Sequence, residues 1–171
     1  MKKLRLLLFA DCDRNCAGCC NKDWDLVSLP PCTNYAQFDE IMLTGGEPMI
    51  APQLVHSAIK RIRKHTTAKI YLYTAKTNAP NELVHVARRL DGLTVTLHTI
   101  EDFMSFIEFS SVLRNCYFMS YTRMSLRLNV FEGIAGDKEL LARFPEWKIK
   151  NNMTWIKNCP LPTDEVFMRY V

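Results

Sequence analysis

The sequence predicts an α/β fold in which parallel strands alternate with helices, as one domain over residues 1–171. Short apolar runs alternate along the chain with segments whose apolar residues recur at helical spacing. Apolar residues make up 48% of the chain and charged residues 23%, so a chain of this length can bury its own core. About six strands are too few for a standard eight-stranded barrel, so we expect an open, partial parallel β/α barrel.

The first half of the chain shows this alternation clearly. Leu4–Ala10 is almost wholly apolar, as expected of a strand covered by helices. Asn21–Asp39 contains prolines and little periodicity, so it is expected to be mostly loop with at most a short helix. Glu40–Thr44 is a second strand that ends at two glycines, Pro52–Lys64 has apolar residues at helical spacing, and Lys69–Thr74 is a third strand.

The second half continues the pattern. It predicts a helix at Asn81–Leu90 with Asn81 as N-cap, a strand at Leu93–Thr99, a helix from Glu101 to about Leu113, a strand at Ser125–Phe131, and a helix at Asp137–Phe144 that ends at Pro145. The C-terminal region allows two interpretations. Ile149, Met153 and Ile156 suit a further helix, which leaves Glu165–Tyr170 as the sixth strand, but Trp147–Lys150 could be that strand instead. We favour the helix.

Two of the predicted strands carry polar residues on one face. Thr94, Thr96 and His98 alternate with Val95 and Leu97, and Ser125, Arg127 and Asn129 alternate with Leu126, Leu128 and Val130. Because helices should cover the apolar face, the polar face is expected to line a ligand cavity. His98, Arg127 and Asn129 are therefore candidate ligands of a cofactor or substrate, and Arg127 can bind a carboxylate or phosphate with two hydrogen bonds.

Charge and compartment narrow the function classes. The formal net charge is +4, and much of the excess lies in residues 60–65, which we interpret as the end of a helix rather than a nucleic-acid patch. The basic and apolar N-terminal run is interrupted at Asp11, before it reaches signal-peptide length, and no stretch approaches the roughly 20 apolar residues of a membrane span. We therefore expect a cytoplasmic protein with no membrane partner. In that compartment, closely spaced cysteines indicate metal binding or catalysis more often than disulfides.

Three of the seven cysteines come directly after the first predicted strand. Cys12, Cys16 and Cys19 are separated by three and two residues. Three thiolates can hold a 4Fe-4S cluster and leave one iron open to a chelator such as the amino and carboxylate groups of S-adenosylmethionine (SAM). The alternative is a zinc knuckle, structural or nucleic-acid-binding, completed by Cys20 or Cys32. Cys32, Cys116 and Cys159 are scattered and are expected to be buried free cysteines.

The spacing and position of these cysteines resemble the radical SAM superfamily. Gly45, Gly46, Glu47 and Pro48 close the second strand, as the Gly-Gly-Glu-Pro segment of that superfamily does. The resemblance implies that Gly45, Gly46 and Glu47 bind the SAM amino group, and that Thr74 and Thr96 lie where polar residues hold the SAM ribose. It also implies that SAM is cleaved to methionine and a 5′-deoxyadenosyl radical with an electron from a flavodoxin or ferredoxin.

A narrower resemblance covers Cys12–Trp24, which is similar to the activating enzymes of anaerobic ribonucleotide reductases at Gly18, Asn21 and Trp24. The superfamily often has an aromatic residue before the third cysteine, where this chain has Gly18. Those activases tend to end soon after the fourth strand, whereas this chain continues. We therefore favour a small polar substrate over a glycyl-radical protein as the partner, for an oxidoreductase or lyase reaction. Nucleic acid is not expected.

Overall fold

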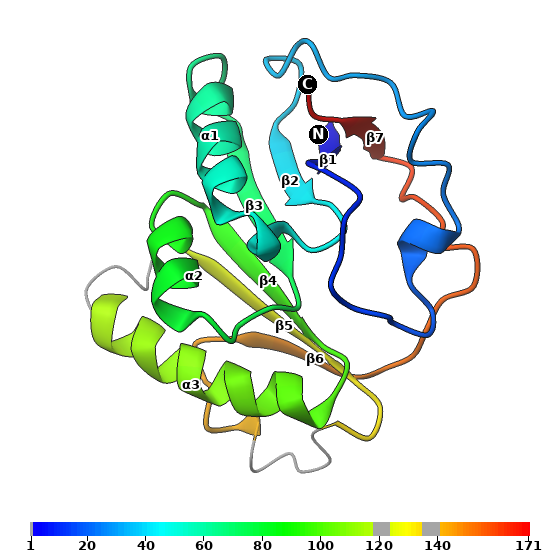
Figure 1. Cartoon of the computed structure of the whole chain (residues 1–171). Helices are drawn as coiled ribbons and strands as arrows, with labels where there is room; N and C mark the ends of the chain where they lie inside the picture. The colour runs from blue at the N-terminus through cyan, green and yellow to red at the C-terminus, as the bar shows by residue number, and fades with distance from the viewer. Residues whose placement is uncertain (1, 118–123, 135–140) are drawn as a thin grey trace. The chain divides into compact units, whose positions relative to one another are not determined.

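The computed structural model describes residues 2–117, 124–134 and 141–171. Seven parallel strands are hydrogen-bonded in the order β6-β5-β4-β3-β2-β1-β7. The strands are β1 (Lys3–Leu7), β2 (Glu40–Thr44), β3 (Lys69–Thr74), β4 (Gly92–Leu97), β5 (Ser125–Phe131), β6 (Lys148–Met153) and β7 (Glu165–Arg169). The helices are α1 (Pro52–Arg63), α2 (Pro80–Ala87) and α3 (Ile100–Tyr117), with short 3-10 helices η1 (Cys20–Lys22) and η2 (Pro48–Ile50). The predicted α/β class is confirmed, with one strand more than expected (Figure 1).

The chain divides into two compact units. The first comprises Met1–Leu72 and Trp155–Val171, and the second comprises Tyr73–Thr154. In the first unit, β1 pairs with β2 on one side and with β7 on the other, so the two ends of the chain lie side by side (Figure 1). Leu4 and Leu6 of β1 are fully buried. The segment between β1 and β2 is long loop with the short η1, as the sequence predicts.

Helix α1 shows why its sequence is helical. Pro52 occupies the first helical position, where its missing N–H costs nothing, and four apolar residues at helical spacing are buried: Val55, Ala58, Ile59 and Ile62. The basic residues cluster at its last turn, where cations complement the helix dipole. The Arg63 guanidinium donates to the Ala68 carbonyl at 2.6 Å, and Arg61 lies over the Tyr170 ring. The basic cluster is therefore the end of a helix, as interpreted from the sequence.

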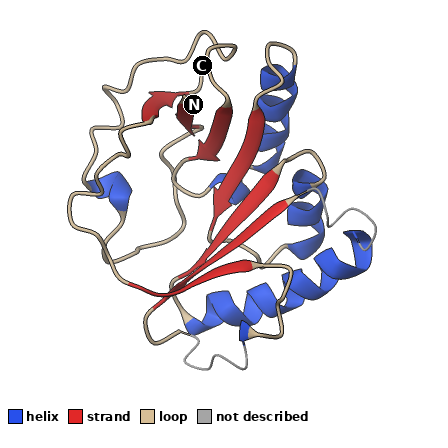
Figure 2. Ribbon diagram, turned by 180° about the vertical axis from the view of Figure 1, so that it is seen from behind, coloured by secondary structure: helices blue, strands red, loops and turns tan. Residues whose placement is uncertain are grey.

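In the second unit, α2 and α3 lie on one side of β4 and β5 (Figure 2). The apolar residues of both strands are buried: Leu93, Val95, Leu97, Leu126, Leu128 and Val130. The rings of Phe144 and Trp147 pack edge-on against Phe106 of α3, with centroids 5.0 Å apart in each pair. The prediction that Asn81 caps α2 is wrong, because Pro80 takes the first helical position and Ala79 becomes the N-cap.

The C-terminal region differs from the favoured interpretation. Residues 148–153 form strand β6 instead of a helix, Ile156 lies outside any helix or strand, and Glu165–Arg169 forms β7 as predicted. Both candidate segments are thus strands. Residues 137–140 of the predicted helix Asp137–Phe144 lie outside the described residues. Within the described ranges, none of the helices has both the length and the apolar character that crossing a membrane requires.

Candidate functional site

The segments that follow β1 and β2 stay hydrogen-bonded to each other beyond the ends of the two strands. The Leu8 amide donates to the Thr44 carbonyl at 2.8 Å, the Gly46 amide to Phe9 at 2.8 Å, and the Glu47 amide to Asp11 at 3.0 Å. Cys12 follows Asp11 directly. The backbone that begins the cysteine loop is therefore hydrogen-bonded to the Gly45–Glu47 segment, so the two sequence motifs are neighbours in space.

The two glycines permit this close approach. A Cβ atom at Gly46 would overlap the carbonyl oxygen of Asp11, and a Cβ atom at Gly45 would lie 2.7 Å from the carbonyl oxygen of Phe9. Any side chain at either position would push the two backbones apart. The glycine pair is thus a steric requirement of the contact between the motifs.

Glu47 connects this segment to η2. Its side chain is buried, with 2% of the residue exposed, and its Oε1 accepts from the Met49 amide at 3.0 Å, so it caps η2 ahead of Pro48. Burial raises the pKa of the Cys12 thiol, a hydrogen bond from the Arg14 backbone opposes this rise, and the negative charge of Glu47 adds to it. The backbone of Glu47 is hydrogen-bonded to Asp11, the residue before Cys12.

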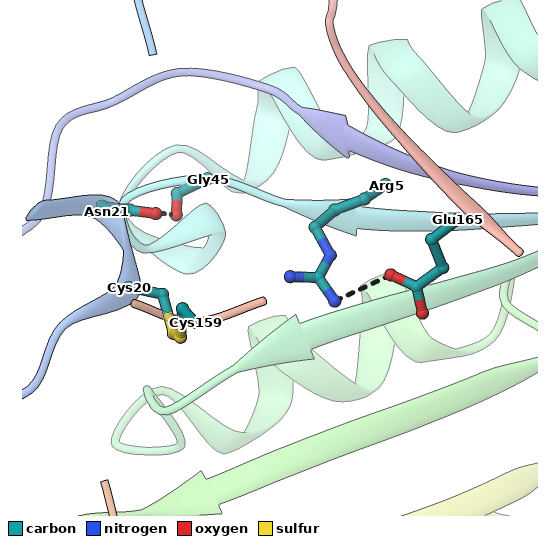
Figure 3. Close-up of a disulfide and its surroundings, with 6 residues drawn as sticks. All are labelled: Arg5, Cys20, Asn21, Gly45, Cys159 and Glu165. Atoms are coloured by element: carbon teal, nitrogen blue, oxygen red, sulfur yellow. Dashed lines mark hydrogen bonds and ion pairs between the residues drawn. A yellow bond between two sulfur atoms is a disulfide. The ribbon is translucent and has the colours of Figure 1, made fainter. Parts of the chain in front are cut away.

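Two side chains of η1 form hydrogen bonds that hold the loop carrying Cys12, Cys16 and Cys19. Asn21 Nδ2 donates to the Gly45 carbonyl at 2.9 Å (Figure 3). Lys22 Nζ reaches back to Asn15 Oδ1 at 3.2 Å and to the Cys16 carbonyl at 3.3 Å. Neither contact was predicted from the sequence. Asn21 could have been found, since it matches the activating enzymes, whereas nothing in the local sequence singles out Lys22.

The donor set of the loop suits an iron–sulfur cluster. Cys12, Cys16 and Cys19 are free cysteines, exposed or partly exposed, on a stretch outside helices and strands that is fixed at Asp11 and at η1. Thiolates are the usual ligands of such clusters. Across residues 2–117, 124–134 and 141–171, no three His, Cys, Asp or Glu side chains are already grouped as a metal site.

The remaining cysteines differ from expectation in part. Cys32 is buried and free, as predicted, but Cys116 is exposed. Cys159, expected to be a buried free cysteine, forms a disulfide with Cys20 (Figure 3). Trp24, a residue of the resemblance, packs edge-on against Phe167 at 5.3 Å between centroids, in a small cluster with Leu7 and Leu29.

The polar face of β4 and β5 belongs to the second unit. Thr94 is paired with Arg127 and Thr96 with Asn129 in the strand register, and Asn129 Nδ2 donates to Thr96 Oγ1 at 3.4 Å. These residues therefore share one face, as predicted. Thr94 is buried and its hydroxyl has no hydrogen-bond partner within the described residues, whereas Arg127 is exposed. A ligand cavity on this face stays a prediction.

Two further candidate ligands have structural partners. Thr74 is buried, and its Oγ1 accepts from the Lys76 amide at 2.9 Å, which stabilises the turn after β3. His98 lies just after β4, with its ring 4.8 Å from that of Phe131 and its Nδ1 4.0 Å from Asp102 Oδ2. The same carboxylate accepts from the His98 amide at 2.8 Å. Ligand contacts by Thr74 and His98 also stay predictions.

Neither a family model nor a curated protein matches the chain. Any functional assignment therefore depends on the residues and contacts described above.

Proposed function

We propose that the chain is a radical SAM enzyme built on an open, partial β/α barrel. The observation that carries the proposal is the backbone pairing of residues 8–11 with residues 44–47, which joins the cysteine loop to the Gly-Gly-Glu-Pro segment. Cys12, Cys16 and Cys19 would hold a 4Fe-4S cluster by three thiolates and leave one iron for SAM. When bound, the cluster supplies the electron that cleaves SAM to methionine and a 5′-deoxyadenosyl radical.

Residues of the chain would orient SAM. The Glu47 amide is hydrogen-bonded to Asp11, next to Cys12, and a carboxylate accepts hydrogen bonds, so Glu47 would bind the ammonium group of the SAM methionine. The Asn21 contact to the Gly45 carbonyl fixes the adjoining backbone. A site held by such contacts loses little entropy when the ligand binds. Contacts of Thr74, Thr96, His98, Arg127 and Asn129 with SAM or with substrate belong to the same proposal.

The contacts of the cysteines argue against the zinc knuckle. Both candidates for its fourth ligand are engaged elsewhere: Cys20 in the disulfide with Cys159, and Cys32 in the core, with its thiol directed to the Asn34 carbonyl. A three-thiolate site suits a cluster with one open iron better than closed tetrahedral zinc.

The proposed substrate is a small polar molecule, and an anionic one because Arg127 is exposed on the polar face of β5. Hydrogen abstraction from it would belong to an oxidoreductase or lyase reaction, with a flavodoxin or ferredoxin as electron donor. The second candidate is activation of a glycyl-radical protein. It is favoured by Asn21, which matches the activating enzymes and holds Gly45.

Cluster binding tests the first step. Anaerobic reconstitution of the full chain should yield about four iron and four sulfide per chain. Replacing Cys12, Cys16 and Cys19 together by Ala should abolish this iron, whereas Cys116→Ala, at an exposed cysteine of α3, should retain it. Tightly bound zinc without iron, or unchanged iron in the triple variant, would overturn the proposal.

SAM cleavage tests the second step. The reconstituted protein should release 5′-deoxyadenosine with dithionite or reduced flavodoxin, measured by chromatography. Glu47→Gln keeps an acceptor for the Met49 amide but loses the charge, so it should weaken SAM binding by about 10- to 100-fold. Glu108→Gln, at an exposed carboxylate of α3, is the matched control. An intact cluster that yields no 5′-deoxyadenosine would refute the proposed activity.

A further inference from the structure

A disulfide lies beside the proposed cluster loop. Cys20 is the residue after Cys19 and opens η1, and Cys159 lies 139 residues further along the chain. The two form a disulfide with their Cα atoms 5.4 Å apart, a separation normal for such a bond (Figure 3). Both residues are partly exposed, so a soluble thiol can reach them. This disulfide ties residues 155–159, here called the tail segment, to the cysteine loop.

Trp155 makes the second contact between the tail segment and the loop. A Cβ atom at Gly18 would lie 2.6 Å from two ring atoms of Trp155, so the indole packs directly on the Gly18 backbone. Gly18 immediately precedes Cys19. Only glycine permits this approach, which gives a physical reason for the residue that departs from the superfamily pattern.

Cys19 lies between these two contacts. It lines a cavity of about 290 Å³ together with Ala17, Gly18 and Lys22 of the loop and with residues 155–158 of the tail segment. The disulfide and the indole thus hold the tail segment along the side of the loop that carries Cys19. Reagents or metal that approach Cys19 from this side must pass the tail segment.

The tail segment is bent sharply where the disulfide holds it. Asn158 and Cys159 have φ angles of 63° and 34°, in the left-handed region that residues other than glycine rarely adopt. Such backbone persists where surrounding contacts enforce it. Cys159 is itself the residue in the disulfide, so opening the bond removes one of the constraints that enforce the bend.

We propose that the Cys20–Cys159 disulfide is a reversible latch that controls access to Cys19. A protein or small-molecule dithiol reduces it: two electrons and two protons pass to Cys20 and Cys159, and the dithiol becomes a disulfide. In the oxidised state the tail segment shields one side of Cys19, which is partly exposed. In the reduced state the bend relaxes, Trp155 leaves Gly18, and the thiol becomes more accessible. The functional consequence, control of iron loading, rests on the proposed cluster; the latch itself does not.

Residue-resolved alkylation of the full-length, metal-free chain tests the latch. Peptide mapping without reductant should recover the Cys20–Cys159 crosslink. Iodoacetamide should then modify Cys19 several-fold faster after treatment with a dithiol than before it. Cys116, which is exposed in α3, should react at the same rate in both states and reports any general unfolding.

Two variants separate the latch from loss of folding. Trp155→Ala keeps the disulfide but removes the indole from Gly18, so Cys19 should react faster in the oxidised protein. In the Cys159→Ser variant, which cannot form the disulfide, Cys19 should react as fast as in the reduced wild type, both with and without dithiol treatment. Cys116→Ser is the matched control. Equal Cys19 rates in the oxidised and reduced wild type, or no crosslink in protein purified without reductant, would overturn the latch. These readouts need neither iron nor SAM, so they stand apart from a failure of the proposed activity.

Discussion

At the scale of single residues, Gly46 is where the two motifs meet most closely. Gly46→Ala would place a methyl group on the Asp11 carbonyl and separate the backbones that the Gly46 and Glu47 amides join. We expect the free energy of unfolding to fall by about 3 kcal/mol, since overpacking at a site without room is costly. Hydrogen exchange should show loss of protection at the amides of residues 46 and 47.

Gly133→Ala is the control for this substitution. Gly133 has a φ of 80°, and a Cβ atom there would meet no atom within 4 Å, so this change isolates the cost of backbone conformation, about 1 kcal/mol. The amides of residues 46 and 47 should keep their protection in this variant. Equal protection in the Gly46→Ala variant would contradict the packing described here.

The same scale shows what sequence could and could not predict about the site. The cysteine spacing and the glycine pair were identifiable because local residue types encode a tight approach and a set of thiol donors. The Cys20–Cys159 disulfide was not, because its partners are 139 residues apart and no local pattern specifies which cysteines pair. The fit of Trp155 on Gly18 was missed for the same reason.

At the scale of elements, the pairing of β1 with β7 is flanked by charges. Arg5 forms an ion pair with Glu165 at 2.8 Å (Figure 3), and Lys3 Nζ lies 2.7 Å from Asp164 just before β7. The hydrogen bond from Lys3 lowers the pKa of Asp164 below its ordinary value of 3.8, and the same bond raises the pKa of Lys3 above 10.5. The Lys3–Asp164 pair therefore makes folding stability depend on pH at both extremes.

The contributions of Asp164 and Lys3 to folding stability depend on pH in opposite directions. The carboxylate has a lower pKa in the folded state, so its contribution is present above pH 3.8 and is lost as pH falls through the folded pKa. The ammonium has a higher pKa in the folded state, so its contribution is present below pH 10.5 and is lost as pH rises through the folded pKa. Between these limits, Asp164→Asn should lower the free energy of unfolding by a small, constant amount, because Asp164 is exposed and Lys3 is only half-buried.

Urea titrations of wild type and Asp164→Asn between about pH 3 and pH 11 would measure this difference. It should shrink at both ends of the range. Glu108→Gln, at an exposed carboxylate on α3, should show no such pattern. A difference that grows below pH 3.8 would contradict the assigned ion pair.

Strand β6 shows why one element was assigned wrongly. Ile149 and Met153 are four residues apart, which mimics a helical face, and the lysines and asparagines between them hide any alternation. Among the described strands β6 is last in the order and pairs only with β5, with a register shift near Asn129, and Asn152 has a φ of 53°. Charged residues and irregularities are typical of edge strands, so the assignment depended on a tertiary position that the local sequence does not state.

At the scale of the whole molecule, the order of strands and helices from β1 to β5 was predictable, because each of these elements carries its own periodicity. Strands β2, β3 and β5 have the predicted bounds. The pairing of β1 with β7 was not predictable. Local patterns place β7 last in the chain, but only tertiary packing brings it back beside β1, so that two distant segments complete the first unit.

A substitution at Phe167 would measure how strongly the packing of β7 beside β1 stabilises the protein. It is buried on β7, faces the Trp24 ring edge-on, and packs in a cluster with Leu7 and Leu29. Phe167→Ala should lower the free energy of unfolding by about 3–5 kcal/mol, because a large cavity would remain between the two segments. Met104→Ala, at a residue 62% exposed on α3, should change it by less than about 0.5 kcal/mol.

Urea unfolding followed by circular dichroism would give both values, and the fluorescence of Trp24, isolated in a background of Trp147→Phe and Trp155→Phe, would report the cluster itself. The Phe167→Ala variant should shift that emission towards the red before global unfolding, since Trp24 loses the ring that shields it. If Phe167→Ala lowered the free energy of unfolding by less than about 1 kcal/mol, the surrounding residues would have to close in around the smaller side chain. In that case β7 would be held beside β1 mainly by its backbone hydrogen bonds and by the Arg5–Glu165 pair.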